Sequence, residues 1–264
     1  MRRLVRDHPL VVFVILAYAL SWWSIPFAGG GLLPYGPSLA ALVVVAVTRG
    51  GADLREWLRS LASLPGRRSW LLVGPGLVTT YLTLALGLTL ALGASITTTH
   101  LDGFAATLLA LVLIGGMWEE PGWTGYALPL LQDRYVDRPL GLLQASLHLG
   151  AIRAVWHLPL AIFGTIPWYD VVFFAMAFQF LVSWLYNRTG SVPAVMLFHL
   201  ASNVVGGAVL VPMFTGADHT RFYLLFIATA WLVALLLNRP HRWGMGRRPV
   251  VPGRAPGGGD HRER

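Results

Sequence analysis

Two adjacent glutamates, Glu119 and Glu120, end an apolar run in the middle of the chain, directly before a Pro-Gly pair. Charged side chains are costly inside a bilayer, so such residues usually face the interior of a helix bundle and serve a function there. A carboxylate in a low-dielectric site becomes a stronger base and can take a proton from water. The glutamate pair therefore indicates acid–base chemistry inside a membrane protein.

Three histidines and one arginine also fall inside apolar segments, namely His148, His157, His199 and Arg153. Arg153 and His157 are four residues apart and therefore share one face of a helix. His199 and Asn203 have the same spacing on another helix. His148 has no partner at helical spacing, so a packing hydrogen bond is its simplest role. Three helices can thus bring a carboxylate, two imidazoles and a carboxamide to one place.

This set of side chains suits the hydrolysis of a peptide bond. A carboxylate can activate water, and a neighbouring histidine can orient that water and carry its proton. A second histidine with an asparagine can donate hydrogen bonds to a developing oxyanion. Pro121 removes a backbone donor, so we expect a kink there, at a place that lines a cavity or is buried in protein. Glu120 and Thr124 share a face if the helix continues through Pro121.

The composition predicts an all-α, polytopic membrane protein. Of the 264 residues, 55% are hydrophobic and 12% are charged, whereas soluble domains carry about 25% charged residues. A spanning helix needs about 20 mostly apolar residues. An amphipathic helix on the membrane surface is expected at about 52–64. We predict an integral membrane domain over 1–238 with about eight spans, at 10–28, 31–48, 70–94, 103–118 with an extension towards 131, 141–163, 171–187, 192–214 and 222–238.

The arginines indicate the orientation of the chain. The net charge is +8, every basic residue is Arg, and 18 of the 20 fall in segments that eight spans place on one side. Arginine-rich loops face the cytoplasm, so we predict a multi-pass protein of the cell membrane with both termini inside. The basic tail 239–264 should be disordered or bound to anionic lipid. The lipid bilayer thus accounts for the positive charge, and no nucleic-acid partner is expected. The chain has 0 Cys, which excludes disulfides and cysteine nucleophiles.

Three motifs resemble a known family. The segments "EEPGWTGYALPLLQ", "RAVWHLPL" and "FHLASN" occur in this order on three predicted helices. They are similar to the Glu-Glu-x-x-x-Arg, Phe-x-x-x-His and His-x-x-x-Asn/Asp motifs of the CAAX prenyl protease and bacteriocin-processing intramembrane protease family. Its members are the bacterial relatives of the type II CAAX endopeptidase. The resemblance extends over roughly residues 30–210.

The resemblance implies an intramembrane endopeptidase and a role for each matching residue. Glu119 would be the general base that activates water, with Glu120 as a supporting carboxylate and His157 as an assistant. His199 and Asn203 would form the oxyanion hole. No cofactor is certain. The family is often labelled as metalloproteases, and Glu119, His157 and His199 could supply a zinc site with an open position, but a metal-free glutamate mechanism is also compatible.

The chain departs from the family pattern at two positions. The arginine of the first motif is Thr124 here, and the phenylalanine of the second motif is Arg153. Two neighbouring carboxylates in a low dielectric cannot both ionise cheaply unless a cation lies near them. We therefore predict that Arg153 reaches across from its own helix and pairs with Glu120, which leaves Glu119 free to act as the base.

Two other functions stay open on the sequence alone. A proton-coupled transporter also uses intramembrane carboxylates and histidines, although the two halves of the chain show no obvious inverted repeat. An inactive family member that acts as an immunity or scaffold protein would explain the loss of the motif arginine at Thr124. For an active enzyme, the partner would be a peptide or membrane-protein substrate, and the sequence does not show whether that substrate is prenylated.

Overall fold

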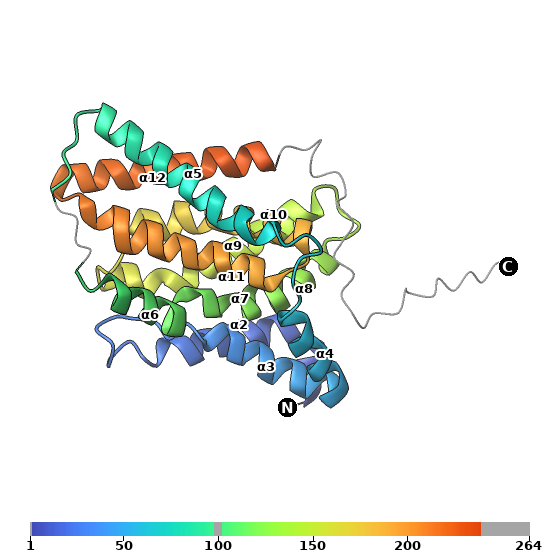
Figure 1. Ribbon diagram of the computed structural model, residues 1–264. Coiled ribbons are helices and arrows are strands. Elements are labelled where there is room, and N and C mark those ends of the chain that lie inside the picture. The colour runs from blue at the N-terminus through green and yellow to red at the C-terminus, as the bar shows by residue number, and fades with distance from the viewer. Residues whose placement is uncertain (1, 98–101, 239–264) are drawn as a thin grey trace.

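The computed structural model describes residues 2–97 and 102–238, and every regular element in these two ranges is helical (Figure 1). The α-helices are α1 (Arg2–Asp7), α2 (Pro9–Trp22), α3 (Gly36–Arg49), α4 (Gly51–Leu61), α5 (Trp70–Ala91), α6 (Phe104–Ile114), α7 (Glu120–Gly122), α8 (Leu128–Arg134), α9 (Gly141–Ile162), α10 (Ala175–Thr189), α11 (Val192–Ala201) and α12 (Gly216–Leu237). Short 3-10 and π-helical segments join several of them into longer rods.

The helices form a bundle that is apolar enough to cross a membrane. Two shorter apolar helices, Pro9–Trp22 and Gly36–Thr48, and the more polar α9 coincide with three of the predicted spans. The predicted all-α membrane bundle is confirmed, while the number of eight spans and their sidedness stay predictions. Five segments are both long and apolar enough to span, namely Trp70–Ala91, Phe104–Arg134, Asp170–Thr189, Val192–Met213 and Gly216–Leu237.

Glycines set two of the close contacts between helices. α3 packs on α2 at Gly36, where an added Cβ would lie 2.0 Å from Ser21 Oγ. α5 packs on α11 at Gly74, where a Cβ would lie 2.9 Å from the Cβ of Phe198. Small residues let membrane helices approach closely, and van der Waals contact then holds them together. The short α7, which carries Glu120, contacts both α3 and α11 and so lies between these two pairs.

The fourth predicted span is not a continuous α-helix. α6 ends at Gly115, whose extended backbone (φ −86°, ψ 172°) interrupts the helix just before the glutamates. A 3-10 turn, Gly116–Glu119, follows it. Pro121 lies in the first turn of α7, where a missing backbone N–H breaks no helical hydrogen bond. The kink expected at Pro121 is therefore wrong in position, because the break lies at Gly115.

A π-helical segment, Trp123–Ala127, follows the glutamates. Pro129 has no N–H to donate to the carbonyl of Gly125, and the indole Nε1 of Trp57 donates to that carbonyl instead, at 3.1 Å. Trp57 belongs to α4, within the predicted amphipathic helix 52–64, and its side chain is buried. The amphipathic helix therefore docks on the segment that carries the site. π-Helical segments are frequent at functional sites.

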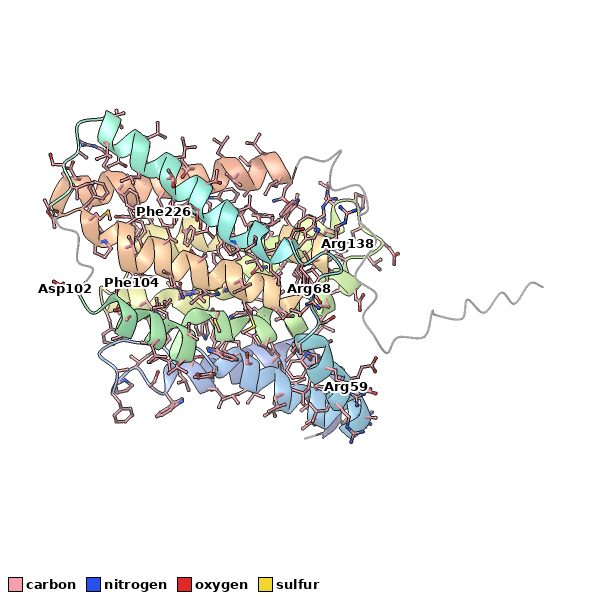
Figure 2. All side chains as sticks on the ribbon, in the orientation of Figure 1. Arg59, Arg68, Asp102, Phe104, Arg138 and Phe226 are labelled. Atoms are coloured by element: carbon pink, nitrogen blue, oxygen red, sulfur yellow. The ribbon has the colours of Figure 1, made fainter. Side chains whose placement is uncertain are left out.

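The labelled charged residues separate towards the two ends of the bundle. Figure 2 shows Arg59, Arg68 and Arg138 at one end, and Asp102 with Phe104 at the opposite end. The arginine-rich end is the one that we predict to face the cytoplasm. The predicted basic tail, residues 239–264, lies outside the described residues.

Candidate active site

Arg153, on α9, is the centre of a buried cluster of ion pairs. Its side chain is only 2% exposed. Its Nη2 atom donates to Glu120 Oε1 at 2.8 Å and to Glu119 Oε2 at 3.3 Å, and its Nη1 atom donates to Glu120 Oε2 at 3.4 Å. One guanidinium thus serves both carboxylates with charge-assisted hydrogen bonds. The predicted pairing of Arg153 with Glu120 is confirmed, and Glu119 shares the same cation.

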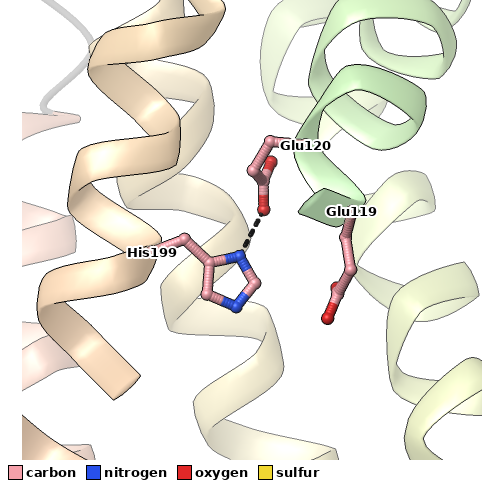
Figure 3. A group of neighbouring side chains, drawn as sticks. All are labelled: Glu119, Glu120 and His199. Carbon is pink, nitrogen blue, oxygen red and sulfur yellow. Dashed lines mark hydrogen bonds and ion pairs between the residues drawn. The ribbon is translucent and has the colours of Figure 1, made fainter. Parts of the chain in front are cut away.

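Glu120 is enclosed on every side by protein partners. It is fully buried, and its Oε1 accepts a hydrogen bond from His199 Nδ1 at 2.7 Å (Figure 3). Its Oε2 accepts one from the hydroxyl of Thr124 at 2.5 Å, so these two residues share a helix face as expected. Both carboxylate oxygens are therefore occupied, which suits a residue that positions Arg153 and His199. Thr124 keeps a hydrogen bond to the carboxylate and leaves the compensating charge to Arg153.

Glu119 differs from its neighbour because it lines a cavity. In the described part of the chain its carboxylate has one hydrogen-bond partner, Arg153. Figure 3 shows Glu120 reaching across to the His199 ring, while the Glu119 carboxylate points away from that hydrogen bond. An ionised carboxylate has acceptor sites for about four hydrogen bonds, so Glu119 can hold a water molecule on its cavity side.

His157 is held in one orientation by the backbone of its own helix. Its Nδ1 atom lies 2.8 Å from the carbonyl oxygen of Arg153, one turn earlier. Because a carbonyl only accepts, Nδ1 carries the hydrogen, and Nε2 of a neutral ring keeps its lone pair. The ring also packs edge-on against Trp156 with centroids 4.7 Å apart. His157 lines the same cavity as Glu119, so a fixed ring nitrogen is available to a molecule bound there.

His199 and Asn203 converge beside Gly116. A Cβ added to this glycine would lie 2.4 Å from His199 Nε2 and 3.0 Å from Asn203 Nδ2. A side chain at residue 116 would therefore clash with both nitrogens, and all three residues line the same cavity. Since Nδ1 of His199 donates to Glu120, a protonated ring offers a second N–H from Nε2 beside the amide of Asn203. Two converging donors of this kind can hold an oxyanion.

A cavity of about 320 Å³ connects these groups. It is lined by Glu119, Arg153, His157, His199 and Asn203, whereas Glu120 lies behind the lining. Ligand cavities are usually about 300–1,000 Å³, with mainly apolar walls and a few convergent polar groups. The walls here fit that description, since they include Leu32, Pro34, Ile114, Leu160, Ile166 and Val211.

Two contributors on α10 could not be recognised from the motifs. Gln179 is fully buried and its Oε1 accepts from Arg153 Nη1 at 3.3 Å, while its amide donates to Ser183 at 3.0 Å. Phe178 places its ring 5.0 Å from the guanidinium carbon of Arg153, within the range of a cation–π contact. The only sequence signal of these two residues is the amide of Gln179, which lies inside an apolar helix.

His148 does not belong to the site. It donates to the carbonyl of Gln144 and does not line the cavity, as its simple packing role predicted.

A metal could in principle use part of this cluster. Glu119, Glu120 and His199 offer ligand atoms that all lie within 4.8 Å of one another. The group contains Glu120 in place of the His157 that the sequence suggested. However, Arg153 Nη2 already bonds an oxygen of each glutamate, and the Nδ1 atom of His199 is used by Glu120. A divalent cation bound between the carboxylates would have to share them with the guanidinium, so the donor set fits a metal poorly.

The comparisons with known proteins concern the part of the chain that holds this cluster. Residues 101–205 match the family model described as type II CAAX prenyl endopeptidase Rce1-like. The site region is Rce1-like. All six site residues named from the sequence, from Glu119 to Asn203, fall inside the Rce1-like region. The resemblance inferred from the three motifs is thereby confirmed.

A curated relative agrees with the Rce1-like match. The chain is 33% identical over 110 residues to the CAAX prenyl protease 2 of Methanococcus maripaludis. This alignment covers 37% of the present chain and 38% of the relative, so the two proteins are similar over well under half of their lengths. No solved structure matches the chain significantly.

Proposed function

We propose that the protein is an intramembrane endopeptidase that hydrolyses a peptide bond with water activated by Glu119. One observation supports this most strongly. Glu119, Arg153, His157, His199 and Asn203 line a single cavity, and Glu120 lies behind the lining, where it bonds Arg153. The Rce1-like match and the curated CAAX prenyl protease 2 point to the same class of reaction.

The first step is the attack of water on the peptide carbonyl. The free acceptor sites of Glu119 bind the water and take its proton as the new C–O bond forms. The Nε2 lone pair of His157 accepts the second hydrogen of the water and fixes its orientation, because Nδ1–H is held by the Arg153 carbonyl. Arg153 donates a hydrogen bond to Glu119 Oε2 at 3.3 Å and so holds this carboxylate in place.

The second step is the collapse of the tetrahedral intermediate. Its oxyanion accepts hydrogen bonds from His199 Nε2–H and Asn203 Nδ2–H, in the space beside Gly116. Glu120 accepts a hydrogen bond from His199 Nδ1 and so fixes the orientation of the ring for this role. The proton held by Glu119 then passes to the leaving nitrogen as the C–N bond breaks. The products are a carboxylic acid, which keeps the second hydrogen of the water, and an amine, and no bond forms between protein and substrate.

The substrate would be a peptide or a segment of a membrane protein. The apolar walls of the cavity fit apolar side chains, and residues of α5, α6 and α12 leave large hydrophobic side chains exposed for contact with lipid, among them Leu72, Leu109 and Leu235. The lipid bilayer is therefore the second partner that we propose.

A peptide library tests this function directly. Purified full-length protein in liposomes is incubated with a library of synthetic peptides, and new termini are identified by mass spectrometry. Wild-type protein and the Glu56→Gln control, whose substitution lies on α4 outside the cavity, should produce the same cleavage products. The Glu119→Gln protein, purified in the same way, should produce none. Proton uptake by the liposomes without any cleavage would refute the peptidase and favour a transporter.

A further inference from the structure

The cavity contains a second carboxylate that the proposed reaction does not use. Asp170 begins the π-helical segment Asp170–Phe174 that leads into α10, and it lines the same cavity as Glu119 and His157. Its Oδ2 accepts a hydrogen bond from the hydroxyl of Tyr223, on α12, at 2.8 Å. Tyr223 lines the cavity as well. The cavity therefore has two polar regions, the reaction centre and the Asp170–Tyr223 pair.

Asp170 has no compensating cation among the described residues. Arg221 lies one half-turn before Tyr223 on α12, but it forms an ion pair with Asp218 at 2.8 Å. Arg153, the arginine that lines the cavity, bonds both glutamates and Gln179. An ionisable group without an opposite charge in an apolar cavity is costly, and such residues are usually retained for a function. The end of the cavity at Asp170 is therefore complementary to a cation.

Aromatic rings lie beside this carboxylate. Phe174 and Phe226 have ring centroids 4.4 Å apart, and Tyr223 and Phe226 have centroids 5.5 Å apart. All three residues line the cavity. A positively charged group is attracted to the face of an aromatic ring within about 6 Å of its centroid. Asp170 and the three rings line one cavity, which is thus suited to a side chain with a long apolar stem and a cationic end.

We propose that Asp170, Tyr223 and the two phenylalanines form a binding subsite for a lysine or arginine side chain of the substrate. The proposal rests on the proposed peptidase function, and it adds a charge preference that the reaction chemistry does not require. The Asp170 carboxylate binds the cationic end of the substrate side chain. Tyr223 holds the carboxylate in place by its hydroxyl, and the rings of Phe174 and Phe226 pack on the stem.

The competing explanation is structural, because the hydrogen bond from Tyr223 to Asp170 also ties α12 to the start of α10. The substitution Asp170→Asn distinguishes the subsite from this structural role. An asparagine oxygen still accepts the tyrosine hydrogen bond, so the tie between the helices remains while the charge is lost. Glu56→Gln is the control, since it removes a carboxylate of α4 that lies outside the cavity lining and leaves the ion pair of Arg221 with Asp218 in place.

Two peptides that differ by one ammonium group provide the test. Acetyl-Phe-Lys-Phe-amide is compared with the same peptide containing norleucine in place of lysine, and binding to purified full-length protein in detergent is followed by tryptophan fluorescence. Trp156 lines the cavity and serves as a local reporter. We expect wild type and Glu56→Gln to bind the lysine peptide about 10-fold or more tightly than the norleucine peptide, as one charge-assisted hydrogen bond provides. In Asp170→Asn the two peptides should bind with similar affinity.

Three results would overturn the subsite. They are equal affinity of wild type for both peptides, absence of binding by either, and a lysine preference that persists in Asp170→Asn. The first two need no variant, so they decide the matter even if Asp170→Asn does not fold. Cleavage is measured separately with the peptide library. A wild-type protein that cleaves peptides without any charge preference would retain the proposed function and lose only this subsite.

Discussion

Replacing Arg153 by phenylalanine, the residue type of the family motif, should inactivate the protein and destabilise it. Arg153 bonds Glu119, Glu120 and Gln179, and its side chain is almost completely buried. Removing one partner of a buried ion pair typically costs about 3–5 kcal/mol, because the remaining charge is left uncompensated. Here two carboxylates lose their cation at once, so the upper part of that range applies. One of them must then take up a proton, and Glu119 can no longer serve reliably as a base.

Adding Thr124→Arg to Arg153→Phe should restore both the activity and the stability that Arg153→Phe removes. The hydroxyl of Thr124 lies 2.5 Å from Glu120 Oε2, so an arginine at this position starts next to the carboxylates. Thr124 is fully buried. Thr124→Arg alone therefore overpacks the site, at a cost of about 1–3 kcal/mol. In Arg153→Phe the guanidinium group of residue 153 is absent, so the arginine of Thr124→Arg can place its own guanidinium there. The double variant then has the arginine and the phenylalanine at the positions of the family motifs.

The assay is a double-mutant cycle on the purified protein, with chemical unfolding and peptide cleavage as the two readouts. Each single variant should be less stable than wild type, and Arg153→Phe should lose about 10²–10⁴ in rate, the usual contribution of a general base. The double variant should regain most of both quantities. Arg153 does not replace the motif arginine if Arg153→Phe is as active as wild type. The same conclusion follows if the double variant is neither more stable nor more active than Arg153→Phe.

Three other predictions concern the oxyanion site, the metal and the topology. Gly116→Ala should lose about 10²–10³ in cleavage rate, because its Cβ fills the space beside His199 and Asn203; an unchanged rate would place the oxyanion elsewhere. Chelators should leave cleavage by wild type unchanged, since Arg153 holds the carboxylates, whereas activity lost with a chelator and restored by zinc would assign them to metal ligation. Because the chain has no Cys, a single introduced cysteine reports the side of the membrane on which it lies. Phe27→Cys should react with a membrane-impermeant maleimide on intact cells, and Leu64→Cys should react only after permeabilisation. The reverse pattern would exclude the proposed orientation.

The sequence predicted those contacts of the site that join residues four apart on one helix. Residues four apart share a helix face, which paired Glu120 with Thr124 and placed Arg153 beside His157. The charge argument then predicted that Arg153 would meet the glutamates, because two neighbouring buried carboxylates require a cation. Both inferences need only local geometry and the cost of burying charge.

The parts that the sequence did not predict depend on the path of the backbone and on contacts across helices. The break at Gly115 and the π-helical segment after it rotate the glutamates relative to a regular helix, so the position of the kink was wrong. Gln179 meets Arg153 from a helix that carries none of the motifs. A role of Gly116 beside the oxyanion donors could not be predicted either, because the contact becomes visible only with His199 and Asn203 in place.

The most direct test of the proposed reaction is the cleavage rate of the Glu119→Gln protein relative to wild type, on a peptide identified from the library. Glutamine retains the shape of the side chain and a hydrogen-bond acceptor towards Arg153, but it cannot take a proton from water. The account predicts a rate lowered by about 10²–10⁴, with an unfolding temperature close to that of wild type. A Glu119→Gln protein that cleaves the same peptide bond at the wild-type rate would contradict the account.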